Sequence, residues 1–468
     1  MLPLRNQLVR EASALYGFVD SVSAHCSHVP QSVAFTESSA RFFQHIDQLA
    51  AATKRHLAAF PTGDVETASE DEFHQTRDEL LTIRRAWQEL HQFIKPAVDA
   101  DTLNQPSALV SAMLNRAKKL PGLQDADFAI FHTDSFAYLQ VNPTSIRGAL
   151  RELAFIVSAE EFPAGLGLIG IPSTQGSALF LNCLVAHEIG EYVYAEKSLN
   201  NYLQPEAEAA LEEVFGEEYR KESKTDKSYL IDTVLGWGKE LFCDLFAVYL
   251  VGPCYTFAYV ELFDLPNLLD KSGAIATSKA RPPIRFYALH PSHPFRVKYQ
   301  ADLLKRLDWW PHLRDIDSRS VRVLEALMRL DDNDFVNADD IGRKPLIQAF
   351  FKILPEITGQ LGHLVGAIDT GVHEFDQLRK HVGAYLREGI VPSTITIEDR
   401  PGETQQITPG SVALLNCFTC FYLEHIEKLM GRVEGQSPTS AEQRVYWFRK
   451  LESWTSKALV DITLFSQP

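Results

Sequence analysis

The chain has 468 residues, enough for two or three domains around a large buried core, which excludes a small disulfide-stabilised protein. Its 61 Asp and Glu residues outnumber 45 Lys and Arg, and the net charge of −16 opposes binding to nucleic acid or to an anionic membrane. A hydrophobic content of 45% with 23% charged residues excludes a disordered chain.

The cysteines and the most apolar stretch bear on where the protein resides. The six cysteines lie mostly inside apolar segments, where we expect small buried side chains in a reducing compartment. The first residues lack the apolar run of a secretory signal, and the stretch 245–260 is too short to span a membrane. We therefore expect a cytoplasmic protein, in which 245–260 is a buried helix broken at Gly252-Pro253.

Amphipathic helices are predicted for the N-terminal part of the chain. From the start to about residue 119, apolar residues recur at spacings of three and four. Ser69 to Glu72 has the Ser-x-x-Glu form of a capping box, and we expect the helix that it opens to stop near Pro96. The N-terminal region is therefore expected to be helical.

Strands are predicted after Pro121-Gly122. Short apolar or alternating runs bounded by turn residues lie at 129–132, 138–141 and 166–171. Residues 165–170 also match the Gly-x-Gly-x-x-Gly string of dinucleotide sites, but that site requires a helix directly after the string, where this chain has Ile171-Pro172. We interpret the segment as a strand.

Helical periodicity returns at 176–194 and 231–262, with an acidic connection at 205–228 that we expect to be exposed. Further helical blocks follow residue 318, interrupted by a strand-like run at 395–397. The sequence thus predicts a mainly α fold with a small β-sheet, of class α+β. The expected regions are an N-terminal helical region at 1–122, a core at 123–317 and a C-terminal helical region at 318–468.

The chemistry is concentrated in a helical segment that contains His187, Glu188 and Glu191. Positions 187 and 191 are four apart, so their side chains project from the same helix face and can hold one ion between them. Glu188 lies beside them, where a carboxylate can take the proton of an attacking water.

A second helical segment places Glu240 and Asp244 four apart on one face, flanked by bulky apolar residues. Two buried carboxylates need a compensating cation. We expect Glu240 to bind a shared metal and Asp244 to orient the imidazole of His187. A third segment places His290, His293 and Arg296 before an amphipathic run, and either histidine can donate a hydrogen bond to a developing oxyanion.

The order of these segments resembles that of the thermolysin-like gluzincin zinc metallopeptidases. Their signature is His-Glu-x-x-His, followed on a later helix by Glu-x-x-x-Asp and in many members by a His-Pro segment. The corresponding strings here are His-Glu-Ile-Gly-Glu at 187–191, Glu-Leu-Phe-Cys-Asp at 240–244 and His-Pro-Ser-His-Pro at 290–294. The resemblance covers about 180–300 and implies a zincin-like core in which His187 and Glu240 bind one zinc ion. It also implies Glu188 as general base and Asp244 as the partner of His187.

Glu191 departs from that family, whose second histidine stands at this position. Two carboxylates and one imidazole neutralise a dication, whereas two imidazoles and one carboxylate leave it at plus one, so the bound water is acidified less. Three interpretations remain: Glu191 binds the metal and favours manganese or iron, a histidine such as His293 replaces it, or the site is degenerate.

We expect a metal-dependent peptide-bond hydrolase, with Glu188 as general base and His293 as a further catalytic residue. We expect the strand at 166–171 to act as an edge strand that aligns an extended peptide substrate by backbone pairing. The alternative is a catalytically impaired relative that acts as a helical interaction or regulatory module, motivated by Glu191 and by the large helical flanks, which offer a surface for a protein partner. No nucleic-acid or membrane partner is expected.

Overall fold

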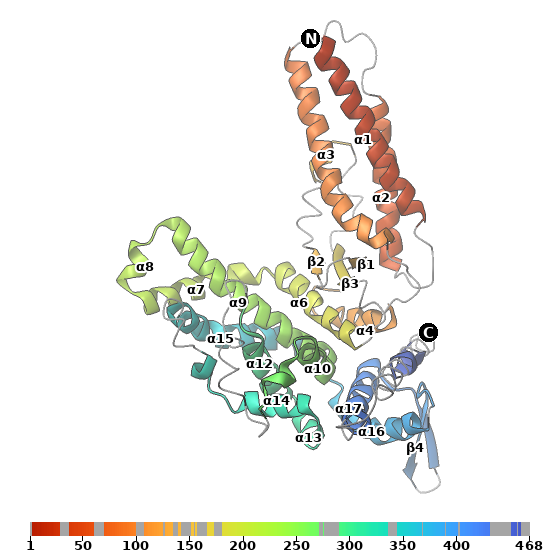
Figure 1. Ribbon diagram of the computed structural model, residues 1–468, viewed down its shortest axis with the longest axis vertical. Helices are drawn as coiled ribbons and strands as arrows, with labels where there is room; N and C mark the ends of the chain where they lie inside the picture. Colours follow the sequence, from red (N-terminus) through yellow and green to blue (C-terminus); the bar gives the residue numbers. More distant parts are fainter. Residues whose placement is uncertain are drawn as a thin grey trace. The chain divides into compact units, whose positions relative to one another are not determined.

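The structure is a computed structural model in which helices predominate (Figure 1). The residues that it describes are 2–28, 37–59, 70–99, 107–124, 127–133, 139–141, 151–153, 155–156, 166–172, 180–270, 275, 290–335, 344–366, 368–388, 390–400, 403–430, 451–455 and 457–459. The mainly α prediction is confirmed. No described helix combines the length and apolar character needed to cross a bilayer.

The chain divides into two compact units. Unit 1 comprises Met1–Ser107 with Asp125–Ser177, and unit 2 comprises Ala108–Gln124 with Ala178–Pro468. This division differs from the predicted boundaries at 122 and 317. The strand region belongs with the N-terminal helices because its first strand packs against two of them, and the helices after 318 join unit 2 because one of them packs against helices that precede residue 252.

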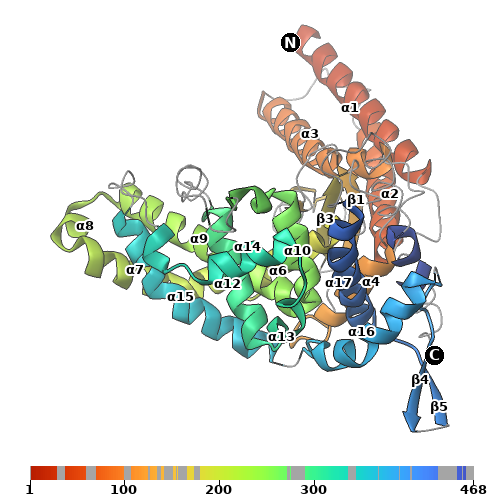
Figure 2. The same ribbon diagram turned by 60° about the horizontal axis from the view of Figure 1, so that its bottom comes forward.

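Unit 1 contains a bundle of three helices, which lie side by side in Figures 1 and 2. They are α1 (Leu2–His28), α2 (Glu37–Ala58) and α3 (Glu70–Asp99). Apolar side chains spaced along them, such as Val19, Ile46 and Ile83, are fully buried, as the amphipathic pattern predicted. Helix α3 continues past Pro96, where it was expected to stop, and Ser69 of the predicted capping box lies outside the described residues.

A three-stranded sheet completes unit 1, at the positions predicted for strands. Its members are β1 (Asp127–Thr133), β2 (Leu139–Val141) and β3 (Leu166–Pro172), in the order β1-β3-β2. β1 runs parallel to β3, and β2 runs antiparallel to it. Since β3 is paired on both sides, it is the central strand, and the prediction that 166–171 offers an edge to a peptide was wrong.

Unit 2 is built around α6 (Val185–Glu196) and α9 (Lys224–Val251), which pack against each other. Helix α9 ends at Val251 and is followed by Gly252, whose φ of 71° is easily adopted only by glycine, and α10 (Pro253–Leu262) begins at the next residue. The predicted break in a buried helix at 245–260 is therefore confirmed.

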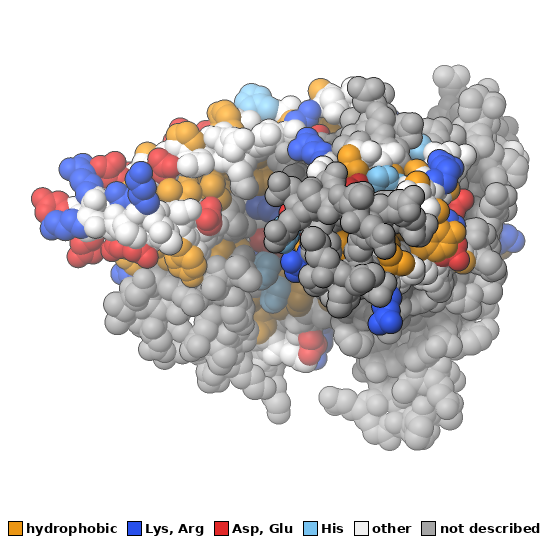
Figure 3. Space-filling model, turned by 90° about the horizontal axis from the view of Figure 1, so that it is seen from above, with side chains coloured by type: hydrophobic (Ala, Val, Ile, Leu, Met, Phe, Trp, Pro, Cys, Tyr) orange, Lys and Arg blue, Asp and Glu red, His pale blue; other side chains and the backbone are white. Residues whose placement is uncertain are grey.

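The segment 205–228 was expected to be an exposed connection, and this prediction was wrong in its secondary structure. Helices α7 (Leu199–Phe215) and α8 (Glu217–Lys221) occupy most of it. Leu203, Ala207 and Leu211 form a narrow buried stripe, which the many glutamates between them conceal in the sequence. Charged side chains of both signs intermingle over the end of unit 2 around α8 (Figure 3).

The remaining elements complete unit 2. Helix α15 packs on α7 and α9, and α12 packs on α9. α16 and α17 lie side by side, and the hairpin of β4 and β5 confirms the predicted strand at 395–397 (Figure 2). The bounds are α4 (Ser107–Ala117), η5 (Leu181–Leu184), η6 (Leu265–Leu268), α12 (His293–Arg306), α13 (Trp310–Leu313), α14 (Arg319–Met328), η7 (Asp332–Phe335), α15 (Lys344–Val365), α16 (Val372–Arg387), β4 (Ile395–Arg400), β5 (Glu403–Ile407) and α17 (Ser411–Met430).

Candidate metal centre

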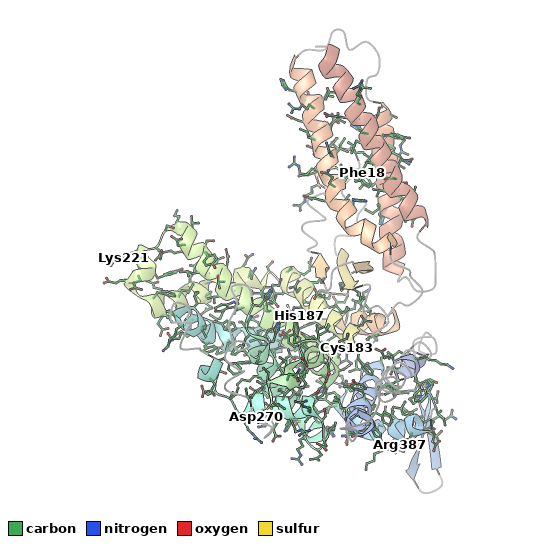
Figure 4. The ribbon with its side chains drawn as sticks, in the orientation of Figure 1. Phe18, Cys183, His187, Lys221, Asp270 and Arg387 are labelled. Atoms are coloured by element: carbon green, nitrogen blue, oxygen red, sulfur yellow. The ribbon has the colours of Figure 1, made fainter. Side chains whose placement is uncertain are left out.

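A glycine allows the two helices that carry the motifs to approach closely. A Cβ atom added to Gly190 would lie 3.0 Å from the Cα of Cys243 and 3.2 Å from its carbonyl oxygen. The backbones of α6 and α9 therefore meet within the segments singled out from the sequence. Figure 4 shows His187 among the packed side chains of unit 2, close to Cys183.

His187 is held by one ring nitrogen and faces a second carboxylate with the other. Its Nδ1 lies 2.9 Å from Oδ1 of Asp244, and its Nε2 lies 3.6 Å from Oε2 of Glu240. Burial lowers the pKa of His187, but the hydrogen bond to Asp244 and the charges of Asp244 and Glu240 outweigh it and raise the pKa to about 9. The imidazole and both carboxylates of α9 thus converge, as the spacing predicted.

Asp244 is the centre of a buried polar network. Arg296 donates to it from two nitrogens, with Nε 2.5 Å from Oδ2 and a terminal nitrogen 2.7 Å from Oδ1. The hydroxyl of Tyr255 donates to Oδ1 over 2.5 Å. Burial raises the pKa of Asp244, but the guanidinium of Arg296 and the imidazole of His187 lower it further, so the carboxylate is ionised at neutral pH.

Glu240 shares the same arginine. A terminal nitrogen of Arg296 lies 3.0 Å from Oε2 of Glu240, and Nδ1 of His290 lies 3.5 Å from Oε1. Burial raises the pKa of Glu240, but the contacts with His290, Arg296 and His187 bring it to about 2. Sequence reasoning assigned no role to Arg296, although an arginine in the first turn of an amphipathic helix, directly after the His-Pro segment, was a usable signal.

Glu191 joins the cluster from α6. Its Oε1 lies 2.7 Å from Nζ of Lys239. One potential ligand atom from each of His187, Glu191 and Glu240 lies within 4.8 Å of the other two, and among the described residues no other group of three His, Cys, Asp or Glu does so. One imidazole nitrogen with two carboxylates is a donor set that zinc, manganese and iron accept. His293 does not belong to this group.

Glu188 lies in the first turn of α6 and is buried. Burial raises the pKa of its carboxyl to about 7, with Glu191 and Glu240 adding to the rise and His187 opposing it. A carboxyl that titrates near neutrality can both accept and return a proton at physiological pH.

His293 is the first residue of α12. It contacts an aromatic side chain of α10 and the aromatic side chain of the residue that follows α10. Its Nδ1 lies 2.7 Å from the hydroxyl of Tyr259, and its ring stacks on Phe263 with ring centres 3.7 Å apart. Burial lowers the pKa of His293 to about 4, helped by the charge of Arg296, so the ring is neutral at pH 7. Tyr255 and Tyr259 were missed in the sequence because tyrosines in an apolar helix look like core residues.

Comparison with known proteins adds nothing to this geometry. No protein-family model, no curated protein and no solved structure matches the chain. The function must therefore be inferred from the described residues themselves.

Proposed function

We propose that the protein is a metal-dependent peptide-bond hydrolase with a zincin-like core. The observation that carries the proposal is the contact of Asp244 with Nδ1 of His187 while Nε2 faces Glu240, which is the arrangement of a metal-binding histidine and its orienting carboxylate. The ligands would be His187, Glu191 and Glu240. Zinc is the expected ion, and manganese or iron are the alternatives because two of the three ligands are carboxylates.

The chain's own residues prepare this site. A divalent cation bound there would polarise the scissile carbonyl and acidify a water molecule. Asp244 accepts from Nδ1 and so fixes the tautomer that leaves Nε2 as the ligand atom. Arg296 bonds to Asp244 and contacts Glu240, which keeps both carboxylates ionised and oriented.

Two further side chains supply the proton chemistry in this proposal. Glu188 takes a proton from the attacking water and returns it to the leaving amine, a role that its pKa of about 7 suits. The hydroxyl of Tyr259 can donate to Nδ1 of His293, which leaves the hydrogen on Nε2 free to stabilise an oxyanion. The peptide bond as substrate rests on the shared order of the three sequence segments, and the cytoplasmic location on the composition.

A binding experiment with one variant tests the mechanism. The full chain, stripped with a chelator, should bind one equivalent of Zn²⁺ or Mn²⁺, and H187A should abolish that binding. E188Q should retain the wild-type stoichiometry but lose about 10²- to 10⁴-fold in hydrolysis of an unfolded protein such as casein. E217Q, on the exposed face of α8, should leave both unchanged. Unaltered hydrolysis by E188Q would remove the mechanism.

One observation favours a second candidate function. Lys239 pairs with Glu191, and Arg296 pairs with Asp244 and contacts Glu240. With His187 protonated, since its pKa is raised to about 9, three cationic side chains balance these three carboxylates without a metal. This suits a catalytically impaired relative that uses its helical flanks to bind a protein partner. Failure of Zn²⁺, Mn²⁺ and Fe²⁺ to bind, together with an unchanged melting temperature on adding each ion, would favour this alternative over the hydrolase.

A further inference from the structure

We propose that Lys239 makes Glu191 the electrostatic equivalent of a neutral histidine ligand, an inference that rests on the proposed function. Nζ of Lys239 lies 2.7 Å from Oε1 of Glu191, across the contact between α9 and α6. Lys239 is also the neighbour of Glu240 in the chain and the only lysine or arginine between residues 228 and 251. A single cation in this apolar stretch is directed at the one candidate ligand that departs from the metallopeptidase pattern.

The pairing of Lys239 with Glu191 changes the net charge of the proposed metal site. A dication with the carboxylates of Glu191 and Glu240 has no net charge, and the ammonium of Lys239 raises the site to plus one. Two imidazoles and one carboxylate around a dication give the same plus one. Arg296 does not supply this charge, because it is bonded through two nitrogens to Asp244 and the two cancel. Lys239 therefore restores the positive field that a zinc site uses to acidify water.

The geometry of the pair also limits how Glu191 can bind. An oxygen that accepts from Lys239 is a weaker ligand, so we expect Glu191 to bind a cation through one atom, as an imidazole does. The Glu191 side chain is 16% exposed and that of Lys239 is 35% exposed, so solvent weakens but does not remove the effect of the ammonium on a neighbouring ion.

Cation affinity in charge variants tests the inference. The probes are Zn²⁺ and Mn²⁺, each competed against a fluorescent chelator with the full chain. K239M removes the repelling ammonium and should tighten both affinities about tenfold, and K239R should stay near the wild type. The matched control is K352M, which removes an ion pair of the same 2.7 Å length between α15 and α7 and should have no effect. K239Q makes the same charge change if K239M folds poorly.

Hydrolysis of casein gives a second readout, in which the effect of K239M should depend on the residue at position 191. K239M should slow hydrolysis in the natural sequence, where it cancels the charge on the site. In the E191H background the site is already at plus one and Lys239 has no carboxylate to hold it there, so K239M should slow hydrolysis much less than in the natural sequence.

The outcomes separate this inference from the proposed function. If the wild type binds neither ion, both fall. Suppose that the wild type binds a cation, K239M binds it more weakly and K239R binds it as tightly as the wild type. Lys239 then only holds Glu191 in place, and the inference is overturned. Unchanged affinity in K239M, or equal slowing of hydrolysis by K239M in both backgrounds, would also overturn it while leaving the hydrolase proposal intact.

Discussion

The helical bundle of unit 1 and the α6–α9 contact of unit 2 pack helices in different ways. Among the described residues of unit 1, the buried polar side chains are Ser23 and Thr53, and charged pairs such as Lys54 with Asp20 lie near the surface. In unit 2, Asp244 of α9 and Arg296 of α12 are buried and bonded to each other, and His187 of α6 contacts the same carboxylate. The same chain thus builds one helix contact from apolar side chains and another around charges.

This difference indicates that the charges serve something other than stability. A buried ion pair loses the solvation of both ions, and replacing such pairs by well-packed apolar residues is often neutral or stabilising. The bundle shows that this chain can pack helices without them. The buried network around Asp244 is therefore better explained by the site that it orients than by the fold that it occupies.

The largest expected effect comes from breaking the buried pair on one side. R296M leaves Asp244 without its main countercharge and should lower the free energy of unfolding by about 3–5 kcal/mol. K54M breaks the exposed pair with Asp20 and should cost about 0–1 kcal/mol. Urea unfolding followed by circular dichroism measures both, and equal losses would contradict the distinction between the two regions.

The pH dependence of the chelator-treated protein comes next in size. The pKa of His187 is raised from its ordinary 6.5 to about 9, chiefly by Asp244 against the effect of burial. The folded state therefore keeps this proton where the unfolded chain loses it. This contribution to the free energy of unfolding, about 3 kcal/mol, is complete below pH 6.5 and is lost as pH rises through 9. The pKa of Glu188 is raised to about 7, so its contribution to stability is likewise lost as pH rises, but at lower pH.

The variant D244N tests whether Asp244 is the cause of the raised pKa of His187. It removes the carboxylate that raises the pKa of His187, so the decline in stability between pH 6.5 and 9 should flatten. Urea midpoints at several pH values in the two proteins measure the slope. A wild-type midpoint that does not fall over this range would show that His187 is not protonated in the folded state.

The sequence predicted the parts of the site that depend on helix spacing alone. His187 with Glu191, and Glu240 with Asp244, share a face because residues four apart on a helix always do. The sequence did not predict that Lys239 would pair with Glu191, or that Arg296 would bridge Glu240 and Asp244, because those contacts depend on which helix faces meet. The metal and the roles of these residues remain predictions.

The same limit applies to the fold. Among the described elements, periodicity located most helices and every strand except β5, and Gly252-Pro253 marked a real break, because turn and helix chemistry are local. The pairing of β3 on both sides and the division into two units depend on contacts between distant segments. No local pattern could have shown that 166–171 is a central strand rather than an edge.

A smaller effect is expected from separating α6 and α9 without touching a charge. In G190A the new methyl group would meet the backbone of Cys243, so the helices must shift, at a cost of about 1–3 kcal/mol and with weaker Zn²⁺ binding. G236A adds a methyl group on α9 with nothing within 4 Å and should stabilise the helix by about 0.5–1 kcal/mol. If both variants were stabilised and bound zinc normally, the close approach would not position the site.

The smallest effect is expected from removing a buried side-chain hydrogen bond between α2 and α3. Among the described residues, it is the one fully buried bond of this kind between these two helices. Nε1 of Trp87 donates to Oγ1 of Thr53 over 3.2 Å, and both side chains are fully buried. T53V keeps the shape but leaves the indole N–H unpaired, at about 1–2 kcal/mol. T82V, which removes an exposed hydroxyl bonded to the carbonyl of Asp78, should change the urea midpoint little. T53V and R296M both leave a buried polar group without its partner, but only R296M leaves a charged one. The difference between their losses in the free energy of unfolding therefore measures the effect of charge apart from that of burial. If T53V cost as much as R296M, burial alone would account for the sensitivity of unit 2, and the argument that its charges mark a functional site would lose its energetic basis.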